Sequence, residues 1–150
     1  MTKYLIDTNL LVLLVLGGSD RSLIGRHKRL KNFDQVDFDG LETILRDATV
    51  LVTLPYILAE TSNLIGVGKR DASLDAMNRF EFFIRQADEY EVKSEAIIGS
   101  PYFRRFGLTD TAIIHLIRDR VHVLTVDHAL YGILDDVGIK TTNLRHRTRL

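Results

Sequence analysis

The chain has 150 residues and no cysteine, which excludes disulfide bonds, thiolate metal sites and cysteine nucleophiles. Its 45% apolar content fits one globular domain with a substantial core, and the lack of cysteine favours the cytoplasm. The formal net charge is zero, so any contact with nucleic acid must come from a local basic patch.

Strands and helices are predicted to alternate almost throughout the chain. The first half is expected to form a strand, three helices, a strand and a helix, over residues 3–6, 10–16, about 20–32, about 39–48, 50–53 and 55–67. The second half is expected to form a long helix, short helical pieces, a helix, a strand, a helix and a strand, over residues about 71–90, 94–106, 109–119, 121–126, 128–136 and 139–142. This order predicts a three-layer α/β/α fold with a short parallel sheet of four to five strands.

Two segments near the amino terminus have local features that bear on these predictions. Ser19 or Asp20 can cap the helix over 20–32, although Gly25 inside it weakens that prediction. The apolar run over 10–16 is too short to cross a bilayer, and we expect neither a membrane span nor a signal peptide.

Three acidic residues fall where strands end or helices begin. Asp7 and Asp127 directly follow the first and third predicted strands, and open parallel sheets bind ligands at the carboxyl ends of their strands. Each could instead cap the next helix, because Asp is a favoured cap. Asp110 opens a predicted helix beside Thr109, where the helix dipole alone favours a carboxylate.

Glu60 has no such simple structural explanation. It lies in mid-helix on the side shared by Ile57 and Leu64, so its carboxylate is predicted to face the core. That placement costs free energy unless the group binds a metal or pairs with a cation; the alternative is an exposed helix face. If the four acids meet, their oxygen atoms suit Mg²⁺ or Mn²⁺ rather than Zn²⁺.

Four stretches in register resemble the motifs of PIN-domain proteins, in particular VapC-type toxin ribonucleases. They are Leu5-Ile6-Asp7-Thr8-Asn9, Leu58-Ala59-Glu60-Thr61-Ser62-Asn63, Leu108-Thr109-Asp110-Thr111-Ala112 and Val123-Leu124-Thr125-Val126-Asp127-His128-Ala129-Leu130. Gly138-Ile139-Lys140 and Asn143 also resemble the last strand of the family and the segment after it. The resemblance spans nearly the whole chain and implies a single PIN-like nuclease domain over 1–150.

The resemblance implies an endoribonuclease that uses one or two Mg²⁺ or Mn²⁺ ions. A metal-activated water would attack phosphorus and leave 5′-phosphate and 3′-hydroxyl ends. The implied metal ligands and catalytic residues are Asp7, Asp110 and Asp127, with Glu60 completing the second-metal side or orienting its waters. The implied supporting polar groups are Asn9, Thr109 and Thr125.

Small bacterial and archaeal members of this family are commonly toxins that form dimers and are blocked by the tail of an antitoxin. The resemblance therefore implies an RNA substrate, a cognate antitoxin and a homodimer. The stretch between Asp7 and Glu60 is longer than in compact toxins, and the excess lies within 20–48. This departure bears on the toxin subclass more than on the nuclease chemistry.

Local basic clusters supply candidate RNA contacts, although a charged helix face is usually only solvated. One cluster lies on a face of the predicted 20–32 helix, and another immediately precedes the Asp110 motif. The candidates are Lys28, Arg29, Arg104 and Arg105. The arginine-rich tail over 145–149 could contact RNA, bind a partner or be disordered.

Three other functions are alternatives to the nuclease. A haloacid-dehalogenase-like phosphotransferase would use Asp7 as nucleophile and carry a second Asp two positions on, where this chain has Asn9. A nucleotide triphosphatase is disfavoured because no glycine-rich phosphate loop occurs. A PIN fold that only binds or scaffolds is the remaining alternative; such proteins often lack some of the acids, and this chain retains all four.

Overall fold

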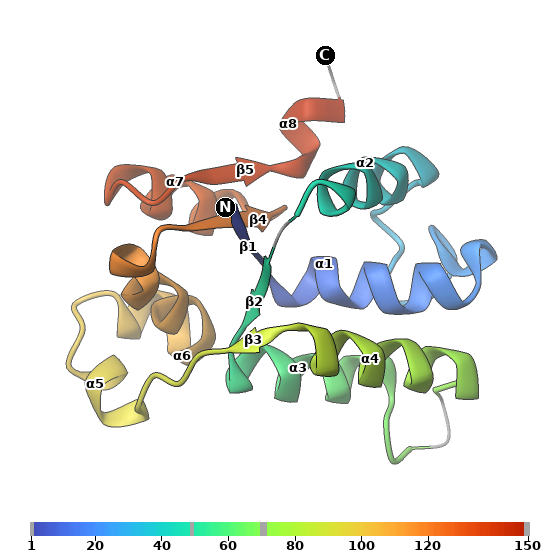
Figure 1. Cartoon of the computed structure of the whole chain (residues 1–150), viewed down its shortest axis with the longest axis horizontal. Helices are drawn as coiled ribbons and strands as arrows, with labels where there is room; N and C mark the ends of the chain where they lie inside the picture. The colour runs from blue at the N-terminus through green and yellow to red at the C-terminus, as the bar shows by residue number, and fades with distance from the viewer. Residues whose placement is uncertain (1, 49, 70–71, 149–150) are drawn as a thin grey trace.

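The computed structural model describes residues 2–48, 50–69 and 72–148, and it is organised around an all-parallel sheet (Figure 1). The sheet has five strands in the order β3-β2-β1-β4-β5. The strands are β1 (Lys3–Ile6), β2 (Val50–Thr53), β3 (Asp88–Glu89), β4 (Val121–Thr125) and β5 (Thr141–Asn143). The chain builds outward from β1 to β3, then returns to add β4 and β5 on the other side, so the strand order reverses between β1 and β4.

Helices cover both faces of this sheet, which confirms the predicted three-layer α/β/α fold. One face carries α1 (Thr8–Val12), which continues as the π-helix η1 (Leu13–Gly17), together with α2 (Gln35–Arg46), α3 (Pro55–Ile65) and α4 (Leu74–Gln86) (Figure 1). The other carries α5 (Ser94–Ile98), α6 (Phe103–Ile114), the 3₁₀ helix η3 (His115–Asp119) and α7 (His128–Asp136) (Figure 1). This division follows from right-handed crossovers that run in opposite directions from the centre of the sheet.

The apolar core lies between the sheet and these two helical layers. Leu5 in β1, Val123 in β4 and Ile113 in α6 are fully buried. The apolar run expected to form the first helix is buried almost throughout, including Leu10 and Leu11. Because α1 begins directly after β1, this packing fixes the carboxyl end of β1 in place. No helix in the described part of the chain is both long and apolar enough to cross a membrane.

The prediction of a helix over residues 20–32 is wrong. The segment contains only a short 3₁₀ helix, η2 (Arg21–Leu23), followed by turns. Ile24 is extended and Gly25 has φ +81°, a left-handed conformation that a helix cannot continue through. A hydrogen bond from Gly25 N–H to Leu30 O, at 2.9 Å, closes the loop instead.

Other element boundaries also differ from the predictions. The long helix expected over about 71–90 is α4, which ends at Gln86 and is followed by the unpredicted strand β3. The helix expected to begin at Thr109 is part of α6, which starts earlier and is interrupted at Gly107 with φ 80°. The tail forms the short helix α8 (Leu144–Thr148), while Arg149 lies outside the described residues.

Candidate functional site

Two of the predicted acids lie at the point where the strand order of the sheet reverses. Asp7 follows β1 directly, and Asp127 follows β4 after one residue. The two strands pair in parallel with Ile6 opposite Leu124, and the N–H of Asp7 donates to the carbonyl of Leu124 at 3.1 Å. A parallel sheet binds ligands at this kind of position because the flanking helices diverge there. The expectation that both acids lie at the carboxyl ends of strands is confirmed, and the two strands are neighbours in the sheet.

The capping alternative is also correct for both residues, and it does not exclude a site. Asp7 Oδ1 accepts a hydrogen bond from Leu10 N–H at 3.2 Å and begins α1. Asp127 Oδ1 accepts one from Leu130 N–H at 2.8 Å and begins α7. These caps hold the two carboxylates in fixed orientations. Asp127 is exposed, and no hydrogen bond joins its Oδ2 to the residues described here, so this oxygen is available to a ligand.

Thr125 connects the two acids. Its side chain is fully buried, and its hydroxyl donates to Asp7 Oδ2. The hydroxyl oxygen, Thr125 Oγ1, also accepts a hydrogen bond from the N–H of Asp127 at 3.0 Å. Burial raises the pKa of the Asp7 carboxyl from 3.8 to about 6, the hydrogen bonds from Thr125 and Leu10 oppose this rise, and the charge of Asp127 adds to it. Asp7 is therefore a buried acid whose ionised form is only partly compensated.

Asp110 is the most strongly perturbed of the four acids. It lies half-buried in α6, three residues beyond the interruption at Gly107. Burial is the largest cause of its raised pKa, which moves from 3.8 to about 7. The remaining causes are the negative charges of the other three acids, Asp127, Asp7 and Glu60. The four carboxylates therefore lie close enough to repel one another.

Glu60 does not face the core, so that prediction is wrong. Its side chain is exposed, because the buried face of α3 is formed by Ile57, Thr61 and Ile65. The carboxylate nevertheless lies at the site. Its Oε2 accepts from Thr8 Oγ1 at 3.2 Å and its Oε1 accepts from Thr109 Oγ1, so it joins α3 to α1 and α6.

The predicted supporting groups occupy different places around the acids. Thr125 orients Asp7, and Thr109 holds Glu60, whereas Asn9 is exposed and lines a cavity that it shares with Asp127. Thr8 is the contact that the sequence interpretation missed. Its position directly after Asp7, at the start of a helix, was the only available signal.

The chemistry of these donors fits a hard divalent cation. All are carboxylate oxygens, and the ion pairs found among the described side chains, Arg21–Asp39 and Arg79–Asp75, neutralise none of the four acids. Within the described ranges, however, no three His, Asp or Glu side chains converge as a ready ligand set. Mg²⁺ commonly keeps several waters and uses only one or two carboxylates, so the residues fit a hydrated ion better than an enclosed one.

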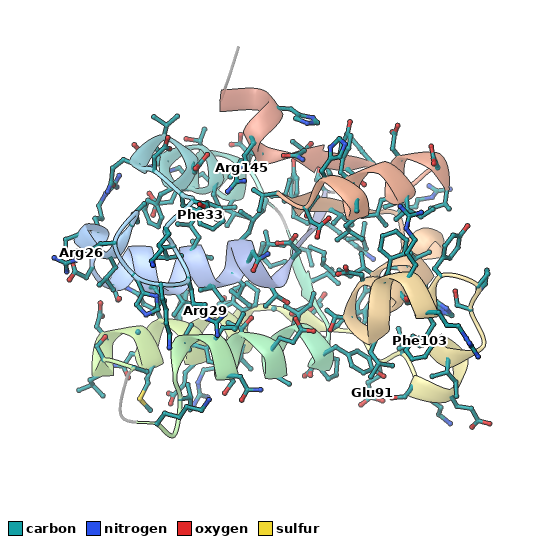
Figure 2. The ribbon with its side chains drawn as sticks, turned by 180° about the vertical axis from the view of Figure 1, so that it is seen from behind. Arg26, Arg29, Phe33, Glu91, Phe103 and Arg145 are labelled. Atoms are coloured by element: carbon teal, nitrogen blue, oxygen red, sulfur yellow. The ribbon has the colours of Figure 1, made fainter. Side chains whose placement is uncertain are left out.

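The candidate RNA contacts divide into two groups. Lys28 and Arg29 line a cavity of about 250 Å³ together with Asp127. Arg104 and Arg105 are exposed near the start of α6, and the Arg105 guanidinium lies 4.7 Å from the centre of the Phe106 ring. Figure 2 shows the neighbouring Phe103 with α5 and α6, well to one side of Arg29. Lys28 and Arg29 are thus the pair that shares a described cavity with one of the acids.

Comparison with known proteins adds nothing to this geometry. The chain matches no protein-family model, no curated protein and no solved structure.

Proposed function

We propose that this protein is an endoribonuclease that hydrolyses RNA phosphodiester bonds with Mg²⁺ or Mn²⁺. The observation that carries the proposal is electrostatic. Burial first, and then the negative charges of the other three acids, raise the pKa of Asp110 to about 7, and none of the four acids takes part in the described ion pairs. Two of these acids lie where the strand order of the parallel sheet reverses. If the acids were purely structural, their mutual repulsion would stay uncompensated, because no described side chain forms an ion pair with them. Bound divalent cations would relieve that repulsion.

In this proposal the residues of the chain have distinct roles. Asp7, Asp110 and Asp127 would hold the cation or cations, and Glu60 would orient bound water. When bound, the cation would polarise a phosphoryl oxygen and lower the pKa of a water molecule. Water oxygen bonds to phosphorus, the bond from phosphorus to the 3′ oxygen breaks, and the proton from water passes to that oxygen. The products are a 5′-phosphate and a 3′-hydroxyl.

The surrounding threonines prepare this arrangement. Thr125 fixes the Asp7 carboxylate from inside the core, and Thr8 and Thr109 fix Glu60 from two different helices. Such preorganisation reduces the reorganisation that charged groups would otherwise need during reaction. Substituting any of these threonines should therefore weaken catalysis without removing a carboxylate.

The finer proposal, a toxin with a cognate antitoxin and a homodimeric state, is supported only by the motif resemblance. A small upstream open reading frame encoding a DNA-binding protein is the expected genomic observation. The alternative is a binding or scaffold protein with the same fold. The cleavage experiment separates these possibilities.

That experiment compares three purified proteins on end-labelled RNA with Mg²⁺ or Mn²⁺. The wild type should cut, and EDTA should stop cutting reversibly. Asp110→Asn, purified in the same way, should lose most activity, which also excludes a contaminating nuclease. Asp136→Asn changes an exposed acid on α7 and should retain activity, so it controls for the charge change itself. Full metal-dependent cleavage by Asp110→Asn, with retained circular dichroism, would exclude the proposed mechanism.

A further inference from the structure

The loop over residues 25–32, here called the basic loop, is held firmly although it is not a helix. Leu30 is fully buried, and its N–H donates to the carbonyl of His27 at 2.8 Å. Arg145 braces the far end, donating to the carbonyl of Asn32 at 3.0 Å and lying 5.3 Å from the centre of the buried Phe33 ring. The backbone of the loop therefore presents its charged side chains from defined positions.

Three cations of the basic loop have neither an ion pair nor a side-chain hydrogen bond among the described residues. Lys28, Arg29 and Lys31 are exposed, and their side chains form no ion pair or hydrogen bond with the described part of the protein. The arginines just before them differ. Arg21 pairs with Asp39 at 2.7 Å, and Arg26 donates to Ser22. The loop therefore concentrates unneutralised positive charge in a protein whose formal net charge is zero.

The basic loop borders the acids through two hollows. The first, of about 250 Å³, is lined by Lys28, Arg29, Asn9 and Asp127, with Arg145 at its wall. Asp127 is one of the four acids, so this hollow opens directly onto the site. Lys31 lines the same hollow.

The second hollow has a volume of about 400 Å³ and shares two lining residues with the first. Lys28 and Arg29 line it together with Asn63, Leu64 and Lys69. Asn63 and Leu64 are one helical turn beyond Glu60 on α3, where side chains three and four apart are neighbours. Figure 2 shows Arg29 between the ribbons of α1 and α3, in agreement with this lining. Lys28 and Arg29 thus line two hollows, one that includes Asp127 and one that includes residues a helical turn beyond Glu60.

We propose that the basic loop binds the phosphates next to the cleaved one in a single-stranded RNA. An RNA strand that places one phosphate at the acids brings the adjacent phosphates close to four negative charges. Cations beside the acids offset the repulsion between those phosphates and the acids. The inference rests on the proposed nuclease function, and it selects Lys28 and Arg29 over Arg104 and Arg105 as the principal contacts.

The test measures binding separately from cleavage. Binding of a fluorescent RNA of about twelve nucleotides is followed by anisotropy in the Asp110→Asn background, at salt concentrations from about 50 to 200 mM. The variant is Lys28→Ala with Arg29→Ala. Arg85→Ala with Lys93→Ala is the matched control, because both residues are exposed and form no ion pair in the described chain. Equal thermal unfolding of the two variants establishes that both are folded.

Loss of two phosphate contacts should reduce the slope of log affinity against log salt by about 1.4, or about 0.7 per contact. The control should keep the original slope. In the cleaving protein, the loop variant should raise KM more than it lowers kcat. A DNA strand of the same length should show the same change, since the contacted group is the phosphate.

Two results would overturn the inference. One is an unchanged salt slope in the loop variant. The other is displacement of RNA by poly-glutamate as readily as by DNA, which would make the loop a surface for acidic peptides. The proposed nuclease function fails differently, by absence of metal-dependent cutting in the wild type. If the wild type does not cut but the loop variant still loses affinity, the phosphate-binding role stands without the nuclease.

Discussion

Replacing Asp7 with asparagine should stabilise the metal-free protein at neutral and higher pH. Asparagine has nearly the same shape, but it removes a charge from a side chain that is only 5% exposed. The pKa of Asp7 rises from 3.8 to about 6 on folding, mainly through burial. Each pKa unit is worth about 1.4 kcal/mol, so the ionised carboxylate costs about 3 kcal/mol once both states are deprotonated.

The pH dependence follows from the order of the two pKa values. Because the folded value is the higher one, the unfolded chain loses its proton first as pH rises. The free energy of unfolding therefore carries no Asp7 penalty below the unfolded value of 3.8, falls as pH rises, and levels off above about 6. Removing the Asp7 charge also relieves Asp110, which it repels, so both effects act in the same direction.

Urea denaturation in EDTA at about pH 4 and about pH 8 measures this difference. At the higher pH, the free energy of unfolding of Asp7→Asn should exceed that of the wild type by up to about 3 kcal/mol. Any weakening of the hydrogen bond to Thr125 reduces this gain. At the lower pH the two proteins should differ little. Asp136→Asn, which is exposed, should follow the wild type at both. A stability difference that does not change with pH, or an Asp7→Asn protein less stable than wild type at the higher pH, would refute the reasoning.

Two further substitutions test individual contacts by urea denaturation at neutral pH. Thr125→Val removes the hydroxyl that donates to the buried Asp7 carboxylate and should cost about 1–3 kcal/mol, whereas Thr125→Ser should recover most of it; equal losses would contradict the hydrogen-bond explanation. Gly25→Ala should cost about 1–2 kcal/mol because its φ is +81°, while Gly132→Ala on α7, where an added Cβ meets no atom within 4 Å, should be neutral or stabilising. A tolerated Gly25→Ala would argue against the loop geometry.

The centre of the sheet could be predicted because its signals are local. The runs before Asp7 and Asp127 are short and mostly apolar, and each acid directly follows one, so the same runs predicted the two strands and the positions of the two acids. The strand β3 could not be found in this way. Asp88 and Glu89 are exposed and polar, and they form a strand only because β2 offers Val52 and Thr53 as parallel partners.

The errors near the site came from contacts distant in sequence. Helical spacing placed Glu60 on the side of Ile57, but it could not show that Thr8 and Thr109 would reach the carboxylate from other helices. Leu30 has the apolar character expected of a helix face, and it is buried as expected. It lies in a loop because Gly25 takes a left-handed conformation. The burial of Leu30 was therefore predicted correctly, whereas its secondary structure was not.

Although the net charge of the chain is zero, the four acids and the cations of the basic loop form two groups of opposite charge. The described ion pairs do not join these two groups. Ion pairs between the basic loop and the acids would lower the pKa of Asp110, yet burial and the charges of the other acids raise it to about 7. Lys28 and Asp127 line one hollow without forming an ion pair in the described structure. Burying Asp7 and Asp110 near other negative charges costs folding free energy in the absence of ligand, as their raised pKa values indicate. A ligand that brings divalent cations to the acids and phosphates to the loop would relieve both groups at once, which is the combination that RNA with Mg²⁺ provides.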